Sequence, residues 1–271
     1  MPAAPAPMMT ASQAFEEECF NSQRRQCGRA VCTAGEARPS FGQRIFSVTT
    51  TLTEGHAPFG EWSGLREIVV ADGVQYRPAD EADGIPGQIK AFRDPAPFRD
   101  ADDSQYLLFT GSSAARPGSH DGVIGIARKC DDGSFAPLAP LVEATGVNNE
   151  LERPHIVRHG GLLYLFWSTQ RGVFVPGILA PTGLYGAVAE TIAGPWRLLN
   201  GHGLVLANPP ERPTQAYSWW VLPDLSVASF VDYWGTESQI DSPADRRRRF
   251  GGTFAPFAAI AVDGATTRLA G

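Results

Sequence analysis

An internal repeat constrains the fold of this chain more than any other feature. Each copy contains, in order, a charged segment with an X-Pro step, an alternating apolar run and a Gly-x-x-Gly segment. These are residues 93–98, 105–111 and 122–127 in one copy, and residues 152–157, 163–168 and 183–188 in the next. Pro95 and Pro154 stand 59 residues apart, and a weaker third copy covers residues 215–234. A repeat of this length, with about four strands, is typical of a β-propeller blade.

The residue pattern inside the repeats indicates strands. β-Branched and aromatic residues alternate with polar ones, and the 29 glycines and 22 prolines spread along the chain predict frequent turns. This excludes a helical solenoid. Further strands are expected at residues 44–53 and at residues 67–76, with a turn at Asp72-Gly73. We therefore predict an all-β propeller.

Composition excludes several classes of function. A net charge of −6 and a pI near 5.4 argue against nucleic-acid binding. No apolar run approaches the roughly 20 residues needed to cross a bilayer. Residues 1–12 lack the cationic start and apolar core of a signal peptide. Residues 1–40 are expected to be loosely ordered, with a short helix over residues 14–19.

The four cysteines do not form paired C-x-x-C motifs. Cys19, Cys27 and Cys32 lie in one short stretch and Cys130 lies far away, so a zinc site is not expected. A disulfide among the first three and free thiols remain alternatives. His155 and His159 are four residues apart on an expected strand, too far for a shared metal, and we assign them structural or solvated roles.

Acidic residues mark the start of two successive repeats. The proline of Asn148-Asn149-Glu150-Leu151-Glu152-Arg153-Pro154-His155 disfavours helix before it, so the segment is extended. Glu150 and Glu152 then share one face, while Leu151 and Arg153 point the other way, and we expect the pKa of one of the two glutamates to rise. The first strand of a blade lines the propeller axis, so Asp94 should approach Glu152 from the neighbouring blade. Such a carboxylate pair resembles a glycosidase site, the alternative being a solvated strand edge.

Four motifs carry a resemblance to a known family. They are Phe92-Arg93-Asp94-Pro95, the segment 148–155, Gln215-Ala216-Tyr217-Ser218 and Phe250-Gly251-Gly252-Thr253-Phe254-Ala255-Pro256. In order and spacing they resemble the levansucrase/inulosucrase family of glycoside hydrolases (glycoside hydrolase family 68), over roughly residues 41–262. The resemblance implies a five-bladed β-propeller, here over residues 41–271, preceded by a non-matching segment, residues 1–40. It also implies transfer of a fructosyl unit from sucrose to water, sucrose or fructan with retention of configuration.

The resemblance also implies roles for individual residues. Asp94 would stabilise the transition state, and Glu152 would be the acid/base that protonates the leaving glucose. The substrate would be bound by the remaining matched residues, Arg93, Glu150, Arg153, Arg171 and Tyr217. The guanidinium groups of arginine and the carboxylates of glutamate can hydrogen-bond the many hydroxyl groups of a sugar. Trp219 or Trp220 is expected near the pocket, whereas the basic run 246–249 is interpreted as a solvated rim loop.

One family element has no match. The family's nucleophile is an aspartate in a Trp-Asp-x-Trp-Pro-like segment, and residues 1–92 contain no counterpart. Glu61-Trp62-Ser63-Gly64 resembles a sugar-binding motif of the family, but it lies too close to Arg93 and is interpreted as coincidence. We therefore expect an N-terminally truncated member, a propeller incomplete at about three to four blades, with absent or strongly reduced hydrolysis. The alternatives are a non-catalytic sugar-binding propeller and a related hydrolase of the β-fructofuranosidase type.

The expected ligands follow from the resemblance. They are sucrose and fructan or fructo-oligosaccharide, with no nucleic acid, membrane or protein partner and no cofactor. Some family members bind calcium through Asp and Asn side chains, but Asn149 stands where those members carry Asp, which weakens the case for a metal here. An extracellular location is expected from the family, although no signal peptide is visible.

Overall fold

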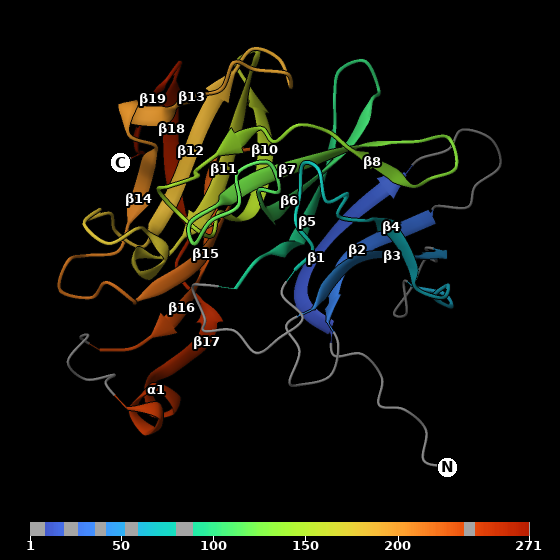
Figure 1. Cartoon of the computed structure of the whole chain (residues 1–271). Helices are drawn as coiled ribbons and strands as arrows, with labels where there is room; N and C mark the ends of the chain where they lie inside the picture. Colours follow the sequence, from blue (N-terminus) through green and yellow to red (C-terminus); the bar gives the residue numbers. More distant parts are fainter. Residues whose placement is uncertain are drawn as a thin grey trace.

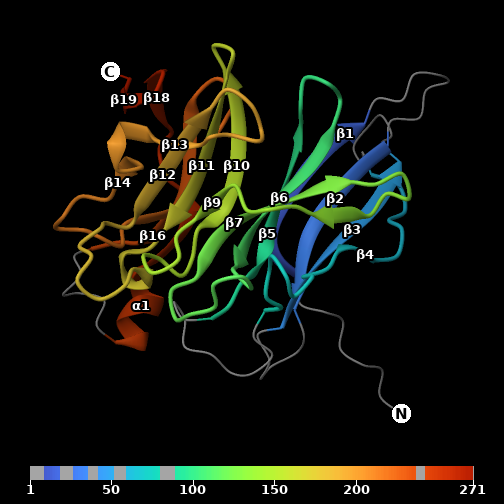
Figure 2. The ribbon, with the colours of Figure 1, turned by 45° about the horizontal axis from the view of Figure 1, so that its top comes forward.

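The computed structural model describes residues 9–18, 27–35, 42–51, 59–79, 89–235 and 242–270, with the backbone alone for the first two ranges. The described strands form four antiparallel sheets that follow one another along the chain (Figures 1 and 2). This arrangement confirms the predicted blades. A single short α-helix among the described residues, α1 (Pro243–Arg249), follows the last long strand of the fourth sheet. No described helix is both long and apolar enough to cross a membrane.

The strand bounds follow the repeats. The first sheet contains β1 (Met9–Glu18), β2 (Cys27–Gly35), β3 (Gln43–Thr51) and β4 (Arg66–Val69). The second contains β5 (Phe92–Arg99), β6 (Gln105–Ser112), β7 (Gly122–Lys129), β8 (Phe135–Pro137) and β9 (Val142–Glu143). The third contains β10 (Glu152–His159), β11 (Leu162–Thr169), β12 (Gly183–Ala189), β13 (Arg197–Leu198) and β14 (Leu204–Ala207). The fourth contains β15 (Ala216–Val221), β16 (Ser226–Tyr233), β17 (Phe250–Phe254), β18 (Ala258–Asp263) and β19 (Thr266–Leu269).

The second glycine of each Gly-x-x-Gly segment makes room for an aromatic ring on the neighbouring strand. Gly125 on β7 pairs with Phe109 on β6, and a Cβ at Gly125 would lie only 2.2 Å from a Phe109 ring carbon. Gly186 on β12 pairs with Phe166 on β11, where the corresponding distance is 3.0 Å. Both rings are fully buried. The glycines therefore recur because each blade packs a phenylalanine across its middle strands.

Three apolar layers join the four sheets. The layer between the first and second sheets includes Ile45, Ile68, Phe92 and Phe109. The layer between the second and third includes Leu108, Ile124, Leu151 and Leu165. The layer between the third and fourth includes Val157, Tyr164, Trp219 and Val221. The first strand of each sheet faces its neighbours, because β5 lies beside β10 and β10 lies beside β15. This stacking is that of propeller blades around an axis.

The N-terminal segment differs from one expectation. The short helix predicted over residues 14–19 is wrong, because residues 14–18 belong to β1, which pairs with β2. Strand pairing within a sheet overrides a weak local helix preference. Cys19 lies outside the described residues, Cys27 and Cys32 lie on β2, and Cys130 is an exposed free thiol. The boundary at residue 40 stays a prediction.

Candidate active site

A β-bulge occurs at the same place on three inner strands. The register shifts by one residue between Arg93 and Ala96 on β5, between Glu152 and His155 on β10, and between Tyr217 and Trp220 on β15. Within each bulge one non-glycine residue has a positive φ: 57° at Asp94, 54° at Arg153 and 60° at Ser218. Such a backbone is strained for an L-residue and is found mainly at functional sites, where bulges redirect side chains.

The bulge on β10 corrects one expectation from strand alternation. Regular alternation places Arg153 on the opposite face from Glu152. In the structure Nη1 of Arg153 lies 3.7 Å from Oε2 of Glu152, and its guanidinium lies 5.4 Å from the ring centre of Tyr217. The extra residue brings Arg153 to the site. Leu151 points the other way, into the core between the second and third sheets, as predicted.

Arg93 is the centre of the site. Its Nη2 donates to Oε1 of Glu152 at 2.8 Å and lies 3.4 Å from Oε2 of Glu150. Its Nε lies 3.7 Å from Oδ2 of Asp94. The structure thus brings together Asp94 and Glu152 from neighbouring blades, as predicted, and adds Glu150 to the same guanidinium. We call Arg93, Asp94, Glu150 and Glu152 the carboxylate cluster.

The carboxylate cluster is buried and carries more negative than positive charge. The side chains of Arg93, Asp94, Glu150 and Glu152 are 12%, 10%, 6% and 9% exposed. Burial raises the pKa of Glu150 to about 7; Arg93 opposes this rise, and the nearby Glu152 and Asp94 carboxylates add to it. The prediction that one carboxyl pKa of the Glu150/Glu152 pair rises is confirmed, with burial rather than mutual repulsion as the larger cause.

Hydrogen bonds fix the segment that carries these carboxylates. Oδ1 of Asn148 accepts the backbone N–H of Glu150 at 2.7 Å, and the hydroxyl of Thr169 donates to the backbone carbonyl of Glu150 at 2.7 Å. The hydroxyl of Thr110 lies 3.0 Å from the carbonyl oxygen of Leu151 and 3.2 Å from Oδ2 of Asp94. Sequence reasoning missed Thr110, because a threonine inside an apolar strand carries no motif.

Three buried polar atoms at the site have no hydrogen-bond partner among the described residues. They are Oε2 of Glu152, Nη1 of Arg153 and the hydroxyl of Tyr217. Oε2 of Glu152 and Nη1 of Arg153 form an ion pair at 3.7 Å without a hydrogen bond. Buried polar atoms in proteins are nearly always hydrogen-bonded, so the missing hydrogen bonds here require an explanation. One acceptor, one donor and one hydroxyl suit the hydroxyl groups of a sugar.

Other predicted residues lie outside the carboxylate cluster. Arg171, on the 3-10 helix η1 (Arg171–Val173), is exposed and takes no part in the contacts that define the cluster. His155 is buried; its Nδ1 lies 3.0 Å from the carbonyl of Arg153, and its Nε2 accepts the N–H of Val221 at 2.9 Å. Its ring stacks on Trp220 at 4.0 Å. His155 therefore has a structural role, linking β10 to β15.

One contact supports the prediction that Trp219 or Trp220 lies near the sugar-binding residues. Trp219 lies edge-on to Tyr217, with 6.0 Å between the ring centres. Within the described part of the chain, no group of three His, Cys, Asp or Glu residues is arranged to hold a metal ion.

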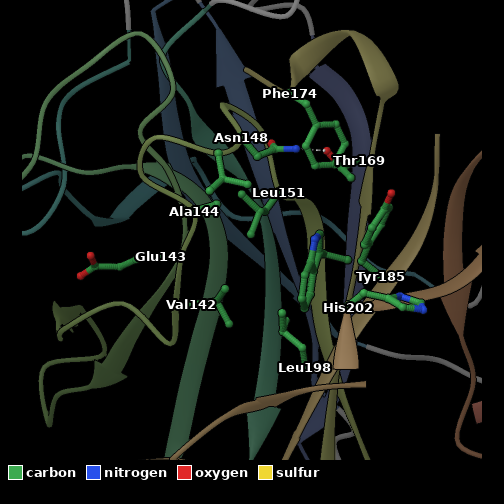
Figure 3. Close-up of a pocket in the computed structure, with 12 residues that line it drawn as sticks. Val142, Glu143, Ala144, Asn148, Leu151, Thr169, Phe174, Tyr185, Leu198 and His202 are labelled. Atoms are coloured by element: carbon green, nitrogen blue, oxygen red, sulfur yellow. Dashed lines mark hydrogen bonds between the residues drawn. The ribbon is translucent and has the colours of Figure 1, made fainter. Parts of the chain in front are cut away.

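A pocket of about 210 Å³ lies beside the segment that carries Glu150 and Glu152 (Figure 3). Its walls include Leu151, Trp167 and Tyr185, and Asn148 donates to Thr169 at its edge, as the dashed line in Figure 3 shows. Glu150 and Glu152 do not line it. Because its lining is mainly apolar, it is a poor match for a sugar, and we place the candidate site at the carboxylate cluster instead.

The fold and the cluster together define the class of this protein. A β-propeller whose axial strands bring buried carboxylates from neighbouring blades onto one arginine is a propeller of the glycoside-hydrolase class. The model of the family described as Levansucrase/Invertase matches residues 120–270, and the chain belongs to this family.

Individual relatives agree with this assignment. The chain is 37% identical over 229 residues to levansucrase LscC of Pseudomonas savastanoi pv. glycinea, covering 73% of this chain and 52% of that protein. It is 36% identical over 225 residues to a levansucrase of Zymomonas mobilis, covering 73% and 51%. The chain therefore spans about half the length of the curated relatives it matches.

Solved structures give the same result. An inulosucrase from Halalkalicoccus jeotgali bound to kestose superimposes with a TM-score of 0.77 at 32% identity, covering 90% of this chain and 67% of that one. Bacillus subtilis levansucrase superimposes with a TM-score of 0.73 at 17% identity, covering 90% and 65%, which supports the fold alone.

Proposed function

We propose that this chain binds sucrose at the carboxylate cluster and supplies the acid/base part of a fructosyl-transfer site. The observation that carries the proposal is the contact of one buried guanidinium with carboxylates from two blades, beside three buried polar atoms that lack a hydrogen bond. Family membership narrows the substrate, because the relatives described above are levansucrases and an inulosucrase.

Each residue of the cluster has a chemical role in this proposal. Glu152 protonates the glycosidic oxygen as glucose leaves, and Asp94 stabilises the positive charge that develops on the fructosyl unit. Arg93 holds both carboxylates in place and keeps them from moving apart by repulsion. With a pKa of about 7, Glu150 is partly protonated at neutral pH and lies beside Glu152 on the same guanidinium.

In this proposal the sugar is bound by the three buried atoms that lack a hydrogen bond. Nη1 of Arg153 donates to a sugar hydroxyl, and the Tyr217 hydroxyl both donates and accepts. Oε2 of Glu152 faces the bond to be broken. A retaining mechanism also needs a nucleophilic carboxylate about 5 Å from the acid/base. Because no nucleophile motif is found in residues 1–92, we propose that water captures the fructosyl unit directly as glucose leaves, so that this chain binds sucrose but turns it over slowly.

The test measures sucrose binding by calorimetry and release of glucose and fructose by the purified chain. Glu152→Gln removes the acid while keeping the size of the side chain. Glu190→Gln, which changes an exposed carboxylate immediately after β12, is the matched control. We expect slow glucose release that Glu152→Gln abolishes and Glu190→Gln preserves.

The alternatives give different results. Sucrose binding with no glucose release from the unmodified chain would assign it to the non-catalytic sugar-binding propellers. Equal glucose release from both variants would remove Glu152 from the mechanism. No binding of sucrose by any of the proteins would refute the proposal.

A further inference from the structure

A second buried cation lies three residues before Arg93. The ammonium of Lys90 donates to Oδ1 of Asp121 at 2.6 Å, to Oδ1 of Asn149 at 2.8 Å and to the carbonyl of Ser119 at 3.1 Å. The Lys90 side chain is 9% exposed, and Asp121 and Asn149 are fully buried. We call Ser119, Asp121 and Asn149 the Lys90 cage.

Asn149, one residue of the cage, stands where calcium-binding members of the family carry Asp. We therefore asked whether the cage could hold a calcium ion. The oxygens lie at hydrogen-bond distances from an ammonium, which has three donors to give. Calcium takes six to eight oxygens at about 2.3–2.6 Å, and a buried ammonium among the ligands would repel it. The residues present do not fit calcium.

The cage connects the second blade to the segment that carries the carboxylates. Asp121 immediately precedes β7, and its other oxygen accepts from Nη1 of Arg77 and from the N–H of Gly118, both at 3.0 Å. Asn149 is adjacent to Glu150, and its backbone N–H donates to the carbonyl of Val173 at 2.9 Å. Lys90 is therefore bonded to the second blade and to the segment leading into the third.

The neighbouring backbone leaves the segment little freedom to move. The N–H of Gly122 donates to the carbonyl of Asn148 at 3.0 Å, and a Cβ at Gly122 would lie 2.6 Å from the backbone of Asn149. Lys90 and Arg93 thus contact the same segment. Lys90 binds Asn149, and Arg93 binds Glu150 and Glu152.

We propose that Lys90 is a positioning residue that takes the structural part a bound cation would otherwise play, so that the site is organised without calcium. Its ammonium compensates the buried charge of Asp121 and fixes Asn149, and through Asn149 it sets the distance of Glu150 and Glu152 from Arg93. Replacing Lys90 with an uncharged side chain leaves the buried Asp121 carboxylate with less compensating positive charge. The segment that carries Glu150 and Glu152 then shifts. The stability part of this inference stands alone, and only its binding part rests on the proposed function.

The experiment compares Lys90→Met, Lys90→Arg and the control Lys129→Met, which removes an ammonium from the far end of β7. Thermal unfolding is followed in EDTA and in millimolar calcium chloride. We expect the Tm of the unmodified chain to be the same in both buffers. We expect Lys90→Met to lower the Tm by about 10 °C and Lys129→Met to change it by only a few degrees.

Sucrose affinity, measured well below each Tm, tests positioning. We expect Lys90→Met to weaken sucrose binding roughly tenfold and Lys90→Arg, which keeps a cation, to recover most of the loss. Equal losses in both variants would mean that side-chain shape rather than charge matters, and would overturn the inference. So would a Tm that calcium raises in the unmodified chain, or an unchanged Tm in Lys90→Met. If the unmodified chain binds no sucrose, the proposed function fails while the thermal comparison still tests Lys90.

Discussion

Two buried titratable side chains near the site give the unfolding free energy opposite dependences on pH. Burial raises the pKa of Glu150 from 4.5 to about 7, with Arg93 opposing, and burial lowers the pKa of His155 from 6.5 to about 4. Folded Glu150 stays protonated up to about pH 7, while the unfolded chain ionises it from pH 4.5. Its contribution is therefore complete below pH 4.5 and is lost as the pH rises to 7. His155 contributes fully above pH 6.5, and its contribution is lost as the pH falls to 4.

The magnitude follows from these values. Each shift corresponds to roughly 3 kcal/mol of unfolding free energy, changing by about 1.4 kcal/mol per pH unit. Between pH 4.5 and 6.5 the two slopes have opposite signs and cancel. The perturbation is Glu150→Gln, which resembles the protonated carboxyl and removes one slope. We expect the unfolding free energy of this variant, relative to the unmodified chain, to increase by about 3 kcal/mol from pH 4.5 to pH 7.

The assay is urea unfolding followed by tryptophan fluorescence at half-unit steps from pH 4.5 to 7.5. Six tryptophans, five of them in the third and fourth sheets or the loops that join their strands, report on the transition. Glu190→Gln is the control, since its exposed carboxylate should change the pH dependence little. A stability difference between Glu150→Gln and the unmodified chain that stays constant with pH would refute the argument that Glu150 is buried and neutral.

Three further substitutions test the packing, the charge centre and the bulge. Gly125→Ala places a methyl group against the buried ring of Phe109 and should cost about 1–3 kcal/mol of unfolding free energy in urea titration, whereas an unchanged midpoint would contradict the packing. Arg93→Lys keeps the positive charge but loses the several N–H donors of the guanidinium, and calorimetry should show sucrose binding at least about tenfold weaker. Equal affinity would mean that a point charge suffices. Ser218→Val forces a β-branched residue to φ near 60° and should lower stability by roughly 1–3 kcal/mol, while Ser218→Gly should not; equal unfolding midpoints would argue against strain at this bulge.

The blades could be predicted from the sequence because their signals are local and repeated. Gly125 and Gly186 recur at a fixed place after an apolar run, and the structure shows that each accommodates a phenylalanine of the adjacent strand. Asp94 and Glu152 could be matched in the same way, because each stands in an X-Pro motif at the start of a blade. Repetition thus located the elements and the first two carboxylates.

The contacts inside the site could not be predicted by the same reasoning. Lys90 meets Asn149 across 59 residues and Asp121 across 31, and no motif marks any of the three as a partner of the others. Such contacts exist only once the blades are stacked. The face of Arg153 was predicted wrongly for a different reason, since alternation assumes a regular strand and a bulge adds one residue.

The three bulges explain how one repeated structure produces a site with different groups on each blade. The backbone at Asp94, Arg153 and Ser218 is nearly the same, with φ between 54° and 60°. The side chains at these positions are an acid, a base and a hydroxyl, so each blade presents a different group near the axis. The residues just before them, Arg93, Glu152 and Tyr217, differ in the same way. A symmetric fold therefore provides an asymmetric site because the strained position is set by the blade, while its chemistry is set by one residue in each copy.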